Sequence, residues 1–312
     1  MRNQEKDITT GRVYLRWQPI AVLVFLSMVM GANMGMIKIG ARDMAPLFMA
    51  GVRSFVAAIC LYIWLERKGA VLFPSRAVLI HGVVTGLLFA GEFAAIYVSL
   101  QYTLASRAYV LLYTAPFFAA LGAHLFLKND RLHPWKVAGL TLAFAGVITL
   151  FLNRLGGFSL AVLPGDLLAL MAGLFWGSTS VYVKQYLAHK IPPLHALFYQ
   201  LAFSAPILFF MSYFMEDPMI WQISPASAFA LFYQCIIIAF LSYLVWFEFI
   251  YRYPVSIIHA FLFFTPVFGV FISGAFLMGE SITPNLLIAL GLVSLGMILA
   301  NRKAPNRSSA EG

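Results

Sequence analysis

The chain has 312 residues, of which 62% are hydrophobic and only 11% are charged, and its mean hydropathy is +0.86. Soluble domains carry about 25% charged residues, so this composition excludes a soluble globular protein and predicts an integral membrane protein. The formal net charge is +9, but the basic residues lie in short gaps between apolar runs, which argues against nucleic acid as a partner.

Apolar runs of about 20 residues, the length that crosses a bilayer as a helix, recur along the chain. In chain order the expected spans are 19–37, 46–65, 78–99, 107–127, 134–152, 164–184, 194–214, 226–247, 255–278 and 284–300. Strands of a membrane barrel would alternate polar and apolar residues over about 10 positions, and these runs do not alternate. We therefore expect an all-α integral membrane protein with ten transmembrane helices.

The basic residues predict how the spans are oriented, because short cytoplasmic loops carry an excess of Lys and Arg. With the N-terminus placed in the cytoplasm, sixteen of the 21 basic residues fall on the cytoplasmic side, four fall outside, and Arg53 lies within a span. The four outer residues are Lys38, Arg42, Arg107 and Arg154. Residues 1–18 and 302–312 are therefore expected to be cytoplasmic tails.

The second half of the chain repeats the first. An offset of 150 residues lays YTAPFF, which contains Pro116, on FFTPVF, which contains Pro266. The same offset also pairs Asp130 with Glu280, Pro134 with Pro284 and Gly146 with Gly296, and an offset of 146 pairs Gly31 with Gly177, Lys38 with Lys184 and Pro46 with Pro192. Each unit has five spans, an odd number, so the second copy must enter the membrane inverted. We expect two inverted five-helix repeats, at 19–154 and 155–301, an arrangement typical of secondary transporters.

The two matched prolines lie near the middle of their spans. Proline removes a backbone hydrogen bond and kinks or opens a helix, and carbonyl groups freed at that depth must face protein or a wet cavity. Pro116 and Pro266 are therefore either packing kinks or parts of a central pathway between the repeats. Their symmetric positions favour the pathway.

Three stretches resemble the EamA-type units of the drug/metabolite transporter superfamily. They are GANMGMIKIGARDMAPLFMAGVRSF, SLQYTLASRAYVLLYTAPFFAALGAHLFLKNDRLHPWKVAGLTLAFAGVITL and HAFLFFTPVFGVFISGAFLMGESITPNLLIALGLVSLGMILAN. With a weaker copy at 165–214 they cover most of the chain. The resemblance implies a ten-helix secondary carrier of the bacterial inner membrane, often an exporter of amino acids or related metabolites, with a site lined by spans one, three, four, six, eight and nine. The family often has Trp-Gly in the first span, where this chain has Met30-Gly31, whereas the second copy keeps Trp176-Gly177.

Two ionisable residues lie well inside spans, Arg53 in the second and Glu92 in the third. At a rise of 1.5 Å per residue, both sit roughly 10 Å below the outer boundary, so the two side chains are expected within reach of each other. Two interpretations stay open. The residues form a structural ion pair between the spans, or they handle a substrate or protons.

Other polar and aromatic residues inside spans are candidates for a substrate site, because an amide needs a partner there and a ring with a polar edge can hold an amphipathic solute. The candidates for substrate binding or the pathway are Asn33, Glu92, Tyr113, Pro116, Trp176, Trp246 and Pro266. The candidates for an ion pair or proton coupling are Arg53, Glu92 and His259. A second group, expected near the cytoplasmic mouth if its helices adjoin, consists of His81, His124, Glu248 and His259.

Enzyme classes find little support. The sequence has no HExxH, GxSxG or GxxxxGK[ST] motif, which would mark a metalloprotease, a serine hydrolase or an ATP-binding loop. We expect a transporter that exports a small metabolite, such as an amino acid, by alternating access. The alternative is a facilitative carrier or channel for a small uncharged solute, with Arg53 and Glu92 as a purely structural pair.

The expected partners are the substrate, the lipid bilayer and protons as a candidate coupling ion. No cofactor or metal is expected, and both a monomer and a homodimer are compatible.

Overall fold

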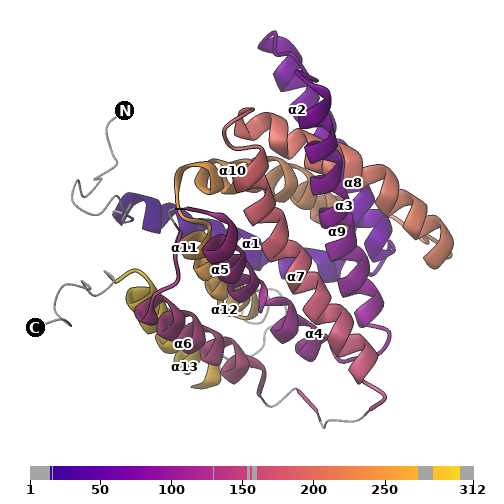
Figure 1. The fold of residues 1–312 in the computed structure, drawn as a ribbon. Coiled ribbons are helices and arrows are strands. Elements are labelled where there is room, and N and C mark those ends of the chain that lie inside the picture. Colours follow the sequence, from indigo (N-terminus) through magenta and orange to yellow (C-terminus); the bar gives the residue numbers. More distant parts are fainter. Residues whose placement is uncertain are drawn as a thin grey trace, which may run out of the picture.

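The computed structural model describes residues 15, 17–128, 130–152, 155–156, 160–272 and 284–302, and these residues form a bundle of helices (Figure 1). The first half contains α1 (Trp17–Gly40), α2 (Pro46–Arg67), α3 (Arg76–Ser99), α4 (Ala105–Leu112), α5 (Ala115–Phe126) and α6 (Pro134–Phe151). The second half contains α7 (Leu163–Tyr186), α8 (Pro193–Met215), α9 (Pro225–Phe232), the π-helix η2 (Tyr233–Ser242), α10 (Tyr243–Arg252), α11 (Val255–Ala260), the 3₁₀ turn η3 (Phe261–Phe263), α12 (Phe264–Val270) and α13 (Pro284–Ala300).

Eight helical segments of the described chain are long and apolar enough to cross a membrane, with α4–α5 and α9–α10 each counted as one segment. The two remaining apolar segments, Val255–Val270 and Pro284–Ala300, are shorter. The end of the expected ninth span, Glu280, Arg154 and most of the two predicted tails lie outside the described residues. The end of the bundle that carries residues 41–45, 100–104 and 216–224 is called the outer end below, following the charge distribution, and the opposite end is called the inner end.

Proline and capping residues determine where several helices begin. Helices α2, α6, α8 and α9 each start on a proline, which loses nothing there because the first N–H groups of a helix have no partner within it. Side chains cap some of the remaining donors. The Ser75 hydroxyl oxygen accepts a hydrogen bond from the Val78 N–H at 3.2 Å, and Ser224 and Ser227 form a reciprocal capping box before α9.

The last helices of the two halves, α6 and α13, lie side by side at one edge of the bundle (Figure 1). A Cβ added at Gly146 would lie 3.0 Å from the Ala289 carbonyl oxygen, and one added at Gly296 would lie 2.6 Å from the Gly139 carbonyl oxygen. The two contacts are equivalent in the repeat, because Gly146 matches Gly296 and Gly139 matches Ala289 at the offset of 150. In each, a residue early in one helix meets a residue late in the other, so α6 and α13 are equivalent and antiparallel.

A second pair of equivalent contacts joins α7 to α5 and α1 to α12. A Cβ added at Gly177 would lie 2.8 Å from the Ala115 carbonyl oxygen, and one added at Gly31 would lie 2.7 Å from the Thr265 carbonyl oxygen. The two carbonyls match at the offset of 150, as the two glycines do at 146. The glycines therefore let each first helix pack directly on the backbone of a proline-bearing span.

The glycine contact gives a testable expectation for stability. We expect Gly177→Ala to lower the free energy of unfolding by about 1–3 kcal/mol, because the added methyl group meets backbone atoms that cannot move aside. Among the described residues, an added Cβ at Gly291 in α13 would meet no atom within 4 Å beyond its own stretch of helix, so Gly291→Ala is a matched control that should be neutral or slightly stabilising. Thermal unfolding in detergent measures both variants, and equal melting temperatures would contradict the contact.

Both proline-bearing spans are interrupted. Helix α4 ends at Leu112 and α5 begins at Ala115, with Pro116 in its first turn. In the second half, the chain passes from α11 through η3 into α12, which contains Pro266. The cause is that proline has no N–H and its ring clashes with the preceding turn. The eighth span also differs from a regular α-helix, because it contains η2, where the Ser242 hydroxyl donates to the Ile237 carbonyl oxygen at 2.7 Å.

Candidate functional site

A cavity of about 160 Å³ lies between the two halves. Its walls come from α1, α2, α3 and α4 of the first half and from α7, α8, η2, α10 and Thr265 of α12 in the second. The six spans implied by the family resemblance all contribute. The second and seventh spans contribute as well, through Arg53 and Gln200.

Six of the residues singled out in the sequence line this one cavity. They are Asn33, Arg53, Glu92, Tyr113, Trp176 and Trp246. Pro116 and Pro266 are buried but are not part of its wall; each stands next to a wall residue, Tyr113 three positions before Pro116 and Thr265 directly before Pro266. Each broken span thus contributes a residue beside its break to the cavity wall, Tyr113 in the first half and Thr265 in the second.

Arg53 and Glu92 face the same cavity without pairing directly. Among the residues that the structure describes, they share no hydrogen bond or ion pair, the contact that one of the two open interpretations required. The Arg53 guanidinium instead lies over the Phe93 ring, 4.3 Å from its centroid, a favourable cation–π contact. Phe93 directly follows Glu92 in α3, so the helix places the ring under the guanidinium and turns the carboxylate toward the cavity.

The charged groups on the cavity wall have unsatisfied hydrogen-bonding capacity. Arg53 is 2% exposed and Glu92 is 8% exposed. The Arg53 Nε and Nη2 atoms and the Glu92 Oε2 atom have no hydrogen-bond partner in the described part of the chain. The amide oxygens of Asn33 and Gln200 also have no hydrogen-bond partner among the described residues. Buried polar groups are normally satisfied, so this wall is suited to a polar occupant.

Aromatic rings form another part of the wall. The Trp176 ring centroid lies 6.0 Å from that of Tyr113, and His259 lies behind the two tryptophans, 6.3 Å from Trp176 and 5.2 Å from Trp246. His259 is fully buried, and neither ring nitrogen has a partner among the described residues. His259 is not part of the cavity wall, and its ring contacts two wall residues, Trp176 and Trp246.

The structure does not gather the four side chains that the sequence placed near one mouth. These are His81, His124, Glu248 and His259, and no hydrogen bond, ion pair or ring contact joins any two of them in the described part of the chain. His81 Nδ1 lies 2.7 Å from the Tyr182 hydroxyl oxygen, and Glu248 forms an exposed ion pair with Arg252 at 2.8 Å. Helix α11, which carries His259, packs on α5 and α10, which carry His124 and Glu248, but among the described residues these side chains do not join into a shared proton site.

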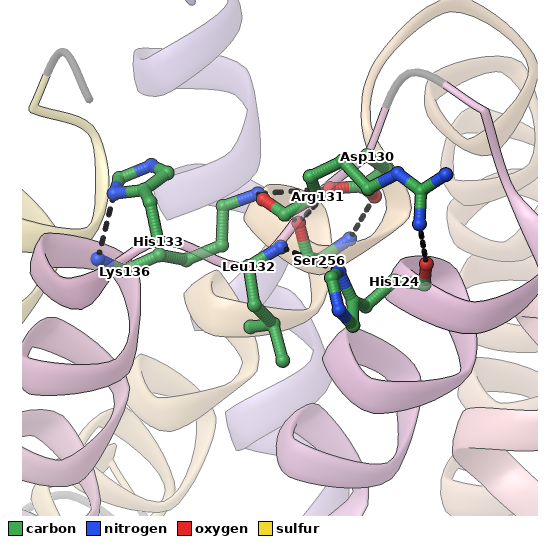
Figure 2. A network of polar contacts seen from close by, with 7 residues as sticks. All are labelled: His124, Asp130, Arg131, Leu132, His133, Lys136 and Ser256. Carbon is green, nitrogen blue, oxygen red and sulfur yellow. Dashed lines mark hydrogen bonds and ion pairs between the residues drawn. The ribbon is translucent and has the colours of Figure 1, made fainter. Parts of the chain in front are cut away.

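At the inner end, a buried polar network joins the two halves (Figure 2). The Lys136 ammonium donates to the Asp130 carboxylate at 2.9 Å and to the Ser256 hydroxyl oxygen at 2.8 Å. The Ser256 N–H donates to the same carboxylate at 2.9 Å, so Asp130 caps the start of α11. The repeat pattern placed Asp130 at a helix end, but its partner in the other half could not be read from the sequence.

At the outer end, a second carboxylate joins loops of the two halves. The Ser224 N–H donates to Asp43 Oδ2 at 2.8 Å, and the Gln222 amide donates to Asp43 Oδ1 at 2.8 Å. Hydrogen bonds from the side chains of Ser224, the larger contribution, and Ser227 hold the pKa of Asp43 well below its ordinary value. The carboxylate therefore stays ionised at neutral pH, and its hydrogen bonds hold the loop of residues 41–45 against the loop of residues 216–224.

The comparison with known proteins agrees with the repeated unit. A model of the EamA-like transporter family matches residues 18–152 and 163–302, one match in each half. The chain belongs to the EamA-like transporter family. This membership confirms the resemblance carried by the three stretches, and it places the two-repeat, all-helical fold among transporters.

Several relatives of this EamA-like transporter match it over nearly their full length. It is 24% identical to the uncharacterized transporter YoaV of Bacillus subtilis (strain 168), with 89% of this chain and 94% of the relative covered. It is 30% identical to a probable amino-acid metabolite efflux pump of Escherichia coli (strain K12), with 90% of each covered. A solved structure has the same fold, with a TM-score of 0.77 at 20% identity over 89% of this chain and 96% of that one.

Proposed function

We propose that this EamA-like transporter is a secondary carrier of the inner membrane that exports a small metabolite with an amino group, an amino acid or a related compound, by alternating access. The observation that carries the proposal is the cavity between the halves, on whose wall Arg53 and Glu92 keep unpaired polar atoms. Relatives named as probable amino-acid metabolite efflux pumps, and others named as inner membrane transporters, support the substrate class and the location.

The chemistry of the wall favours a zwitterion. A carboxylate of the solute can accept from the free Nε and Nη2 of Arg53, and an amine can donate to Oε2 of Glu92, in charge-assisted hydrogen bonds. The rings of Trp176 and Tyr113 offer an apolar surface for the rest of the solute. A cavity of about 160 Å³ suits a molecule of this size.

The repeat geometry supports the mechanism. Helices α6 and α13 pack antiparallel, and a shift of 150 residues converts each of their two glycine contacts into the other. Two inverted five-helix repeats in a ten-helix carrier require this arrangement. A site between inverted repeats can be exposed to either side by rocking one repeat against the other.

A ligand screen tests the function. Purified protein is mixed with a panel of amino acids, their amides and their deaminated analogues, and thermal unfolding is followed. A ligand present at 100 times its dissociation constant adds about 2.7 kcal/mol of stability, so a substrate should raise the melting temperature. Proteoliposome exchange of that ligand should then saturate and show counterflow, as a carrier requires. If only uncharged solutes stabilise the protein, or if flux does not saturate, the alternative carrier or channel is favoured.

The prolines give a separate expectation for transport. Pro116→Ala and Pro266→Ala should each lower flux more than they lower expression or melting temperature, because a continuous helix would move Tyr113 or Thr265 from the wall. Pro206 lies inside α8, is exposed and is not part of the wall, so Pro206→Ala is a suitable control that should transport normally. Normal flux in both Pro116→Ala and Pro266→Ala would make these prolines packing features only.

A further inference from the structure

Lys38 and Lys184 are equivalent residues in the last turns of α1 and α7, yet their surroundings differ. The Lys184 ammonium donates to the carbonyl oxygens of Ile250 and Tyr251, at 2.6 Å each, and approaches that of Tyr253 at 3.4 Å. These carbonyls end α10 at the inner end of the bundle. Lys38 is exposed at the outer end and has no hydrogen bond or ion pair in the described part of the chain.

The cavity shows the same difference between its two ends. At the outer end its wall includes Leu100, which is 39% exposed, and Ile37, which is partly exposed. At the inner end the wall residues Val183 and Ile250 are 0% and 1% exposed. The wall residues are therefore partly exposed at the outer end and fully covered at the inner end.

The helix packing explains why the inner end is covered. Helix α7 packs on α10 next to Lys184, whereas α1 packs on α2, α9, η2, η3 and α12 and has no comparable packing on α3. The carbonyl groups in the last turn of a helix have no partner within it and carry the negative end of the helix dipole. An ammonium group that bridges several of these carbonyls therefore holds two helix ends together.

Resting on the proposed carrier function, we infer that Lys38 and Lys184 form a two-ended gate. In the structure Lys184 closes the inner end by binding the last carbonyls of α10. In the opposite state α1 closes on α3, and Lys38 takes the equivalent place on the carbonyls of Leu100, Gln101 and Thr103, which match Ile250, Tyr251 and Tyr253 at the offset of 150. Because the two contacts are equivalent in the repeat, each state replaces the contact that the other loses, which keeps the two states close in free energy.

Sided labelling of one cavity position tests the gate. Ser180 of α7 lines the cavity and is 3% exposed, so Ser180→Cys, with Cys60 and Cys235 replaced by alanine, reports access. Vesicles of known orientation are treated with a membrane-impermeant thiol reagent on either face, and the ratio of the inner to the outer labelling rate is measured. We expect Lys184→Met to raise this ratio about tenfold, the effect of losing a charge-assisted contact, and Lys38→Met to lower it. Lys184→Arg should stay near the parent ratio.

The outcomes separate the gate from the transport proposal. Lys190 is an exposed lysine in the loop after α7, and Lys190→Met should leave the ratio unchanged. Folding of each variant is checked by its melting temperature, and because Lys38 is exposed and unpaired, Lys38→Met should fold normally. Opposite shifts for the two methionine variants support the gate even if no metabolite is transported. Shifts in the same direction, or no shift in folded Lys38→Met and Lys184→Met proteins, overturn the gate even if transport is found.

Discussion

Glu92→Gln should lower the flux of an amine-bearing substrate by at least about tenfold, while the melting temperature of the free protein changes little. The lost interaction is a charge-assisted hydrogen bond to the substrate, which is worth about 1.5–3 kcal/mol. The fold should tolerate the change because Glu92 Oε2 has no partner to lose among the described residues. Flux into proteoliposomes and thermal unfolding of the same preparation measure the two effects, and a loss of pH dependence in the remaining flux would add proton coupling to the role of Glu92.

A double-mutant cycle with Arg53 distinguishes this role from a structural one. If the two residues only neutralise each other, Glu92→Gln alone should destabilise the protein and the additional change Arg53→Gln should restore much of that loss. In a substrate site, the double variant should rescue neither flux nor ligand-induced stabilisation. Glu248→Gln, which alters an exposed ion pair, is the control for loss of a carboxylate. Wild-type flux in the double variant would rule out the proposed role.

Asp130→Ala should lower the free energy of unfolding by about 3–5 kcal/mol, because it leaves the Lys136 ammonium buried without its countercharge and removes the cap from α11. The side chains of Asp130 and Lys136 are only 4% and 6% exposed, so water cannot replace the lost carboxylate. The matched change Glu248→Ala breaks an exposed i,i+4 pair and should cost only about 0.3–0.5 kcal/mol.

The partner residue gives a second arm to this experiment. The double variant Asp130→Asn with Lys136→Met keeps the shape of the site but removes both charges, so it should recover much of the stability that Asp130→Ala loses. Chemical unfolding in detergent measures all three proteins. Equal stability of Asp130→Ala and Glu248→Ala would mean that the network in Figure 2 does not hold the two halves together.

The sequence alone was enough to predict the class of protein and its internal repeat. A bilayer demands about 20 apolar residues for each span, so hydropathy along the chain locates the helices. It does not reveal the breaks in the fourth and ninth spans or the π-helix in the eighth. The offset of 150 is visible because equivalent contacts need the same residue types, as with Gly146 and Gly296. Polar side chains deep in spans are rare enough that Asn33, Arg53 and Glu92 were recognised as candidates before their surroundings were known.

Only the tertiary structure decided which of these side chains meet. Lipid and helix interiors are both apolar, so hydropathy along one helix does not say which of its faces packs on which neighbour. For this reason the sequence placed Arg53 and Glu92 at one depth but left open whether they pair, where the structure has two groups facing one cavity, and nothing in the sequence indicated that Asp130 reaches Ser256. Gln200 reaches the cavity because α8 packs on α2 and α3. Such contacts depend on the summed packing of many side chains across helices, which no single span encodes.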